Sequence, residues 1–412
     1  MTIFSPRLLA VLASSGLAAL SAMLMQLALL LQSPLADYGL FAFLQVLQAL
    51  LLGVSSALFS APLLSRQQDS FTNATIKTGS YFVLQLLFVL GSGTLVMLIA
   101  ESYDIAFNTA VWLGVAVALQ LWRWFARSLL QNNVNTKSLI YSDALFSFLA
   151  IIGTVLLWAQ GQISLLHLAK LNALAAASSL AMSGSSFWQQ HWRMWQQRDW
   201  QLWQQGFCRQ AKPALIGVVS TEAAANSHSY LITLIAGPAA FAPVAVAAML
   251  FRPCALLLTN LAQLTRGQLQ QLWLGKKPLA PLLAHFRRQS IWLWFGNSGL
   301  LLVLCGLAGD KILVWLAMND WVTTDIYIAV LLWGGLSLLR TLRSASTIQL
   351  QVQDQFAALA HTALWPALLS VVLVFIFLQL WPAVWTIAAV ILSEVWMAWL
   401  LRLAVRRSAE IP

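Results

Sequence analysis

Apolar runs of about twenty residues follow one another along almost the whole chain, and short segments between them carry most of the charge. A helix needs about 20 apolar residues to cross the hydrocarbon core of a bilayer. Applied to this chain, that length predicts twelve membrane spans. They cover residues 8–32, 40–64, 80–100, 109–129, 140–159, 164–186, 213–236, 241–263, 289–309, 326–346, 358–380 and 384–404.

The balance of polar and apolar residues also requires lipid. Hydrophobic residues make up 60% of the 412 and charged residues only 9%, whereas soluble domains carry about 25% charged residues. The first apolar run, from Leu8 to Leu31, is longer than the roughly 7–15 apolar residues of a cleaved signal peptide. We therefore expect an all-α polytopic membrane protein whose first run remains as a span.

The positive charges set the orientation. With the N-terminus inside, 20 of the 23 Lys and Arg residues fall in cytoplasmic segments and one, Lys311, falls outside. The positive-inside rule predicts this bias, so both termini are expected in the cytoplasm. Because the cations lie in short loops between spans, the net charge of +10 reflects membrane topology, and no nucleic-acid partner is expected.

The inner segment 188–212 is rich in Trp and Gln. On a helix, its Trp residues and Phe207 gather on one side, which predicts an amphipathic helix in the lipid headgroup region. A Trp platform for stacking nucleic-acid bases is the alternative interpretation. This segment separates two predicted six-helix lobes, residues 1–187 and 213–412.

The two predicted lobes resemble each other weakly. Residues 36–66 and 238–266 each hold a span that runs from outside to inside, and each ends in a hydroxyl residue followed by Arg. This similarity suggests two parallel repeats related by a pseudo-twofold axis along the membrane normal. Transporters built in this way bind their substrate between the lobes.

The sequence gives no sign of an enzyme. No predicted loop is long enough for a folded domain, and there is no G-x-x-x-x-G-K-[ST] motif for nucleotide phosphates. The three cysteines, Cys208, Cys254 and Cys305, are far apart in sequence and lack metal-ligand spacing. We therefore expect neither a metal nor another cofactor.

Four stretches resemble the Wzx-type polysaccharide flippases of the multidrug/oligosaccharidyl-lipid/polysaccharide superfamily. Pro34–Phe41 (PLADYGLF) is similar to the family's entry to helix two, and Leu121–Gln131 (LWRWFARSLLQ) to its Arg-containing exit from helix four. Ala214–Gln263 is similar to helices seven and eight, and Ile312–Arg407 to the closing helices. The resemblance implies a flippase in the bacterial inner membrane that moves undecaprenyl-diphosphate-linked oligosaccharide between leaflets, without covalent chemistry. It also implies a polysaccharide polymerase and a chain-length regulator as partners beside the membrane lipids.

Cations within the predicted spans are the candidate substrate-binding residues, because an ionisable group at bilayer depth is costly. Lys170, with His167 three residues earlier, would bind a diphosphate or an acidic sugar; alternatively Lys170 extends to the outer interface. Arg252 precedes Pro253 at an expected kink and would bind phosphate bidentately or pair with freed carbonyls. Arg123 and Arg127 would collect the diphosphate from the inner leaflet or act only as positive-inside anchors.

The acidic groups within the spans are candidates for coupling or charge pairing. Glu222 shares a helix face with Asn226 and would pair with Lys170 or carry a coupling proton; a structural ion pair is the alternative. Glu394 lies near the middle of the last span and needs either a partner or a wet cavity. Asp143, near the inner end of the fifth span, is expected to be solvated.

Four functions therefore compete at this stage. A flippase fits the topology, the two lobes and the cationic interior. A cation-coupled drug or small-molecule antiporter of the same superfamily shares the architecture but favours an acidic cavity. A polysaccharide polymerase or ligase would be the enzyme alternative, although the large outer loop typical of those proteins is missing. A structural scaffold explains the buried Lys and Arg poorly.

Overall fold

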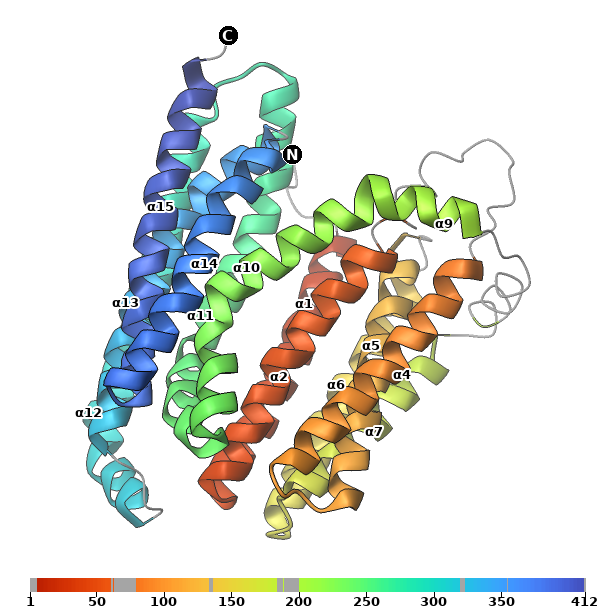
Figure 1. The fold of residues 1–412 in the computed structure, drawn as a ribbon, viewed down its shortest axis with the longest axis vertical. Coiled ribbons are helices and arrows are strands. Elements are labelled where there is room, and N and C mark those ends of the chain that lie inside the picture. The colour runs from red at the N-terminus through yellow and green to blue at the C-terminus, as the bar shows by residue number, and fades with distance from the viewer. Residues whose placement is uncertain are drawn as a thin grey trace. The chain divides into compact units, whose positions relative to one another are not determined.

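The computed structural model describes residues 6–60, 62, 79–132, 136–183, 188, 200–318, 323–353 and 355–410. Within these residues every regular element is a helix (Figure 1). The predicted all-α polytopic membrane fold is confirmed.

Each of the twelve predicted spans coincides with an observed helix. In the first half they are α1 (Pro6–Gln32), α2 (Leu35–Ser55), α4 (Gly79–Ser102), α5 (Phe107–Asn132), α6 (Thr136–Ala159) and α7 (Leu165–Ala181). In the second half they are α10 (Lys212–Leu231), α11 (Pro238–Leu274), α12 (Ala280–Met318), α13 (Thr323–Val352), α14 (Phe356–Leu380) and α15 (Thr386–Glu410). Short π-helical turns extend α2 as η1 (Ser56–Ser60) and α10 as η3 (Ile232–Ala236), and a 3₁₀ turn, η4 (Ala383–Trp385), precedes α15.

Nine of the described helices are long and apolar enough to cross a membrane. Two further apolar helices, Gly16–Gln32 and α7, are shorter. Helix α10 is in neither group, and Glu222, Asn226 and His228 are among its residues. Polar residues on a helix of a membrane protein mark a functional candidate.

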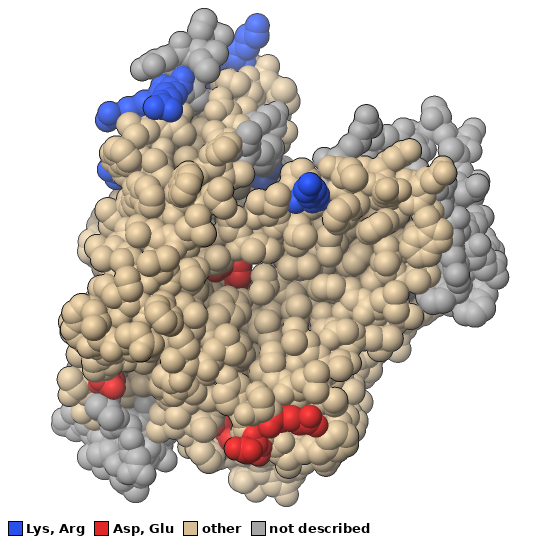
Figure 2. Space-filling model, viewed as in Figure 1, with Lys and Arg blue, Asp and Glu red and all other residues tan. Residues whose placement is uncertain are grey.

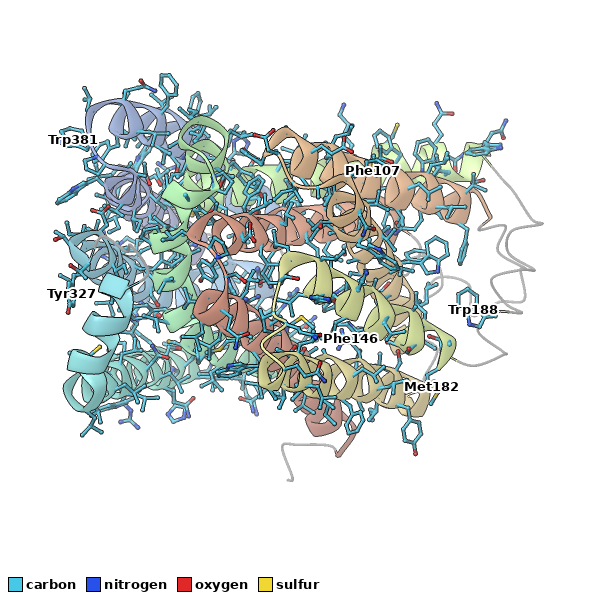
Figure 3. The ribbon with its side chains drawn as sticks, turned by 90° about the horizontal axis from the view of Figure 1, so that it is seen from below. Phe107, Phe146, Met182, Trp188, Tyr327 and Trp381 are labelled. Atoms are coloured by element: carbon cyan, nitrogen blue, oxygen red, sulfur yellow. The ribbon has the colours of Figure 1, made fainter. Side chains whose placement is uncertain are left out.

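The described surface is apolar over wide areas. Large exposed side chains include Leu300, Leu302 and Leu307 of α12, and Figure 2 shows that most of the visible face carries no charge. Tyr327 and Trp381 lie at the outer edge of the second half in Figure 3 and are exposed. Such a surface suits contact with lipid, with aromatic rings at the interfaces.

The chain divides into two compact units, Met1–Val219 and Ser220–Pro412. A continuous helical run from Trp200 to Ala236 crosses this boundary; it consists of α9 (Trp200–Gly206), η2 (Phe207–Ala211), α10 and η3. The predicted domain boundaries, after residues 187 and 212, remain predictions.

Most of the predicted interfacial helix 188–212 lies outside the described residues. In its described part, Trp203 packs against the buried cluster of the first unit that includes Phe59, Phe82 and Phe125. The ring of Trp203 also stacks on Phe207, with centroids 5.3 Å apart. Trp203 therefore contacts protein, while Trp188 and Trp200 are exposed. The headgroup interpretation of the segment remains a prediction.

Small residues position α5 in the first unit. A Cβ atom added to Gly114 of α5 would lie 2.5 Å from the carbonyl oxygen of Gly93 on α4. Small residues at such crossings let two membrane helices approach closely. Helix α5, which carries Arg123 and Arg127 in its second half, also packs against α7.

Helix α13 is central to the second unit. It packs against α11, α12 and α15, and Gly334 gives room to the ring of Phe251 on α11. Leu336, Ala345 and Ile348 of α13 are buried. This central helix also carries Arg340 and Arg343.

Candidate functional site

A buried charge cluster in the first unit joins two predicted site residues. Arg123 and Arg127 lie one turn apart on α5, and both pair with Asp143 of α6. The Arg123 Nη2 to Asp143 Oδ1 distance is 2.7 Å, and the Arg127 Nε to Asp143 Oδ2 distance is 2.9 Å. The three side chains are 4%, 9% and 2% exposed. We call these three residues the first-unit cluster.

Neutral groups close the first-unit cluster. Arg123 Nε donates to Ser179 Oγ of α7 at 2.9 Å, and Ser142 of α6 bonds to Ser179 as well. The guanidinium of Arg123 lies over the ring of Phe146, 3.9 Å from its centroid, and Figure 3 shows Phe146 among the helices of this unit. Because its partners come from α6 and α7, Arg123 ties three helices together.

A second cluster of the same composition lies in the second unit. Arg340 and Arg343 of α13 both contact Glu394 of α15: Arg340 Nε lies 3.0 Å from Oε1, and Arg343 Nε lies 3.0 Å from Oε2. Arg340 also donates from Nη2 to the carbonyl oxygen of Ala225 on α10, at 2.9 Å. We call Arg340, Arg343 and Glu394 the second-unit cluster.

The arginine pairs of the two clusters lie on equivalent helices of the predicted repeats, whereas the acids do not: Asp143 lies on the fifth helix of the first half and Glu394 on the sixth helix of the second. Helix α5 is the fourth of six helices in the first half, and α13 is the fourth of six in the second. Each carries two arginines about one turn apart, and each arginine pair meets a single carboxylate. With two cations and one anion, each cluster has a formal charge of +1. The correspondence supports an internal repeat.

Lys170 and His167 lie near the start of α7. Lys170 is exposed, and its Nζ lies 5.8 Å from the centroid of the Trp112 ring, within cation–π range. The ring nitrogen Nδ1 of His167 lies 2.9 Å from Ser164 Oγ, which also accepts a bond from the His167 backbone N–H. His167 therefore contacts the N-cap residue of its own helix, and Lys170 remains the more accessible group.

Glu222 is bound to neutral groups on its own helix. Its Oε1 accepts hydrogen bonds from Asn226 Nδ2 and from Tyr230 Oη, both at 2.8 Å. The predicted pairing of Glu222 with Lys170 remains a prediction. Arg252 is half-buried in α11 next to Pro253; its role as a phosphate ligand also remains a prediction.

The sequence interpretation missed two features of these sites. Asp143 was expected to be solvated, and this is wrong: the residue is buried between two arginines. Arg340 and Arg343 are among the 20 cations counted on the cytoplasmic side, and their pairing with Glu394 was not predicted. Their spacing of three residues in the tenth span, like the spacing of four between Arg123 and Arg127, is the signal that could have revealed them. Among the described residues, no group of three His, Cys, Asp or Glu could hold a metal ion.

Comparisons with known proteins place the fold. No protein-family model and no curated protein match the sequence. A structure of a multidrug resistance MATE family transporter of the MOP superfamily, in an inward-facing conformation, matches with a TM-score of 0.67, 12% identity and coverage of 96% of this chain and 95% of that chain. The lipid II flippase MurJ, in an inward closed conformation, matches with a TM-score of 0.65, 13% identity and coverage of 96% and 87%.

A third similar structure is a MOP superfamily transporter from Pyrococcus furiosus, in which reverse polarity of the binding pocket suggests a different function (TM-score 0.60, 12% identity, 97% of this chain and 94% of that chain). The chain has the fold of MOP-superfamily transporters. At 12–13% identity the likeness is one of fold alone, and it leaves the substrate open because structures of this fold include both a multidrug resistance transporter and a lipid II flippase.

Proposed function

We propose that the chain is a flippase that carries an undecaprenyl-diphosphate-linked oligosaccharide from the inner to the outer leaflet of the bacterial inner membrane. It works by alternating access and serves surface polysaccharide assembly. A polysaccharide polymerase and a chain-length regulator are the proposed protein partners. Lys170, Arg252, Arg123 and Arg127 are the proposed contacts for the diphosphate or for acidic sugars.

The charge balance at membrane depth carries this proposal. Within the bounds of the twelve predicted spans the sequence places seven cations and three acids; five of these cations lie at the inner ends of their spans and are also among the 20 counted as cytoplasmic. The cations are Arg123, Arg127, Lys170, Arg252, Arg340, Arg343 and Arg402, and the acids are Asp143, Glu222 and Glu394. An excess of cations within membrane spans is costly unless an anion compensates for it. A lipid diphosphate is an anion of the right kind for a membrane carrier.

Complementation tests the proposal. Expression of the chain in a strain that lacks its polysaccharide flippase is expected to restore surface polysaccharide. The matched control is the variant Lys170→Ala at the same protein level. If the chain restores no polysaccharide in strains with several repeat-unit structures, although it is inserted at normal levels, the flippase proposal fails.

A cation-coupled antiporter is the second candidate, and Glu222 favours it. Both hydrogen bonds that this carboxylate accepts come from neutral groups, Asn226 and Tyr230, so a proton or a sodium ion would meet an anionic oxygen there. An antiporter predicts that cells expressing the chain resist cationic drugs. It also predicts that Glu222→Gln removes this resistance. A flippase for polysaccharide predicts no drug resistance in these cells.

A further inference from the structure

The second-unit cluster is more open than the first-unit cluster. The side chains of Arg340 and Arg343 are 27% and 23% exposed, whereas those of Arg123 and Arg127 are 4% and 9% exposed. Both carboxylates are almost completely buried. The excess positive charge of the second unit therefore lies on groups that a ligand can reach.

The hydrogen bonds of the second-unit cluster are also incomplete. Arg343 Nε and Glu394 Oε2 lie 3.0 Å apart, yet each is a buried atom without a hydrogen-bond partner, because the N–H does not point at the oxygen. The contact from Arg343 Nη2 to Glu394 Oε1 is long, at 3.5 Å. Among the described residues, neither Arg340 nor Arg343 makes a hydrogen bond through Nη1. Donors of a guanidinium therefore remain for a further acceptor.

In the first-unit cluster, by contrast, all three guanidinium nitrogens of Arg123 contact an acceptor. There, Arg123 donates from Nε to Ser179 at 2.9 Å and from Nη2 to Asp143 at 2.7 Å, and Nη1 makes a longer contact of 3.5 Å to Gln120. Aromatic rings cover both arginines, Phe146 over Arg123 and Trp124 over Arg127. No comparable set of side-chain hydroxyl and amide groups binds Arg340 and Arg343 in the described part of the second unit, where Arg340 instead reaches a backbone carbonyl.

The surroundings of the second-unit cluster favour an anion. Trp333 lies seven residues, about two helix turns, before Arg340. Its ring centroid is 6.0 Å from the Arg340 guanidinium, and its ring makes a T-shaped contact with the buried His228 of α10. Ser337, Ser344 and Thr347 lie on α13 within a turn of the arginines. None of these neighbouring groups is an acid, and Glu394 is the acid that pairs with the two arginines.

We propose that Arg340 and Arg343 form a binding site for a phosphate-bearing anion in the second unit, with a diphosphate as its natural ligand. The free guanidinium N–H groups would each hold phosphoryl oxygens, since planar guanidinium groups bind phosphate bidentately. Glu394 is a positioning residue that holds both arginines on one side and competes with the ligand for them. The choice of a diphosphate over a single phosphate rests on the proposed function. The existence of an anion site at these arginines does not depend on that function.

Equilibrium binding of radiolabelled pyrophosphate to the full chain in nanodiscs of zwitterionic lipid tests the site. Wild-type chain is expected to bind pyrophosphate more tightly than inorganic phosphate. Arg340→Gln/Arg343→Gln should weaken pyrophosphate binding at least about tenfold, roughly the loss of one charge-assisted pair. Glu394→Gln should tighten it several-fold, because the competing carboxylate is gone. The control, Arg406→Gln/Arg407→Gln, removes the same charge from exposed positions of α15 and should bind like wild type.

These opposite changes separate binding from a structural role. An ion pair that only joins α13 to α15 would lower stability in both kinds of variant without raising pyrophosphate affinity in Glu394→Gln. Affinity that is unchanged in the double arginine variant, or reduced in Glu394→Gln, overturns the proposal. If the double variant does not fold, two single variants test the proposal. Glu394→Gln is expected to bind pyrophosphate more tightly than wild type. Arg343→Lys, which keeps the charge but loses the planar pair of donors, is expected to bind it more weakly.

Two sources of the anion are distinguished by adding undecaprenyl diphosphate to the nanodiscs. Displacement of labelled pyrophosphate by the lipid assigns the site to a lipid headgroup; pyrophosphate binding without displacement assigns it to a soluble diphosphate. Pyrophosphate binding in a chain that fails to restore surface polysaccharide would leave the anion site in place and remove the flippase. Restored polysaccharide without pyrophosphate binding would support the flippase and reject the anion site.

Discussion

Asp143 shows how strongly a single buried carboxylate can matter in this protein. It contacts Arg123 and Arg127 at the same time, and the Ser179 hydroxyl that Arg123 also binds is neutral. Removal of one member of a buried ion pair leaves an uncompensated charge, which costs about 3–5 kcal/mol. Here the removal would leave two cations.

We therefore expect Asp143→Asn to lower the thermal unfolding temperature of the detergent-solubilised protein strongly. The substitution keeps the size of the side chain, so the loss reports charge and not packing. Asp104→Asn, at an exposed turn after α4, is the control and should unfold like wild type. Equal stability of the two variants would show that the first-unit cluster contributes nothing to folding.

Lys170 is a single residue whose substitution tests the proposed recognition of the substrate. It is exposed on α7 and lies over Trp112, so its removal leaves no buried partner. Lys170→Ala and Arg252→Ala are expected to abolish surface polysaccharide in the complementation assay at normal protein levels, and Lys170→Arg should retain part of it. Lys276→Ala, in an exposed turn, should be fully active. Full activity of both Ala variants would reject cationic recognition by these residues.

At the scale of helices, the crossing of α4 and α5 depends on two glycines. A Cβ atom on Gly114 would lie 2.5 Å from the Gly93 carbonyl oxygen, and one on Gly93 would lie 2.9 Å from the Gly114 carbonyl oxygen. Both are backbone atoms, so the helices themselves would have to separate. Overpacking of this kind typically costs about 1–3 kcal/mol.

Gly114→Ala is accordingly expected to reduce the unfolding temperature and the yield of folded protein. Gly91→Ala, two residues from Gly93 on the same helix, meets no atom within 4 Å and is the matched control. Thermal denaturation monitored by fluorescence-detected size exclusion separates the two. A Gly114→Ala variant as stable as Gly91→Ala would mean that α4 and α5 do not cross as closely as the structure has them.

The existence of the helices follows from the sequence, whereas their pairing does not. Run length alone predicts a span, because the thickness of the bilayer fixes the number of apolar residues required. The partner of a charged residue depends on which helices become neighbours, and no local pattern contains that information. Asp143 looked like a solvated residue near a helix end because its two partners lie 16 and 20 residues earlier, on another helix. Glu394 was correctly expected to need a partner, but its arginines lie more than 50 residues away.

For the whole molecule, orientation in the membrane is the property on which the transport direction depends. The assignment of 20 cations to one side and one to the other holds only if every predicted span crosses, because a missed or extra span would exchange the sides of all later loops. Reporter fusions after Arg66, within residues 188–212 and at Pro412 are expected to report the cytoplasm, and fusions at Glu101 and Asp320 the outside. The fusion within 188–212 is the most informative, since six spans precede it and six follow. An outside signal there would mean that an odd number of the first six helices crosses, with α7, the shortest of them, the first to be doubted. The lobes would then run in opposite directions through the membrane, and the parallel repeat that aligns Arg123 and Arg127 with Arg340 and Arg343 would have to be abandoned.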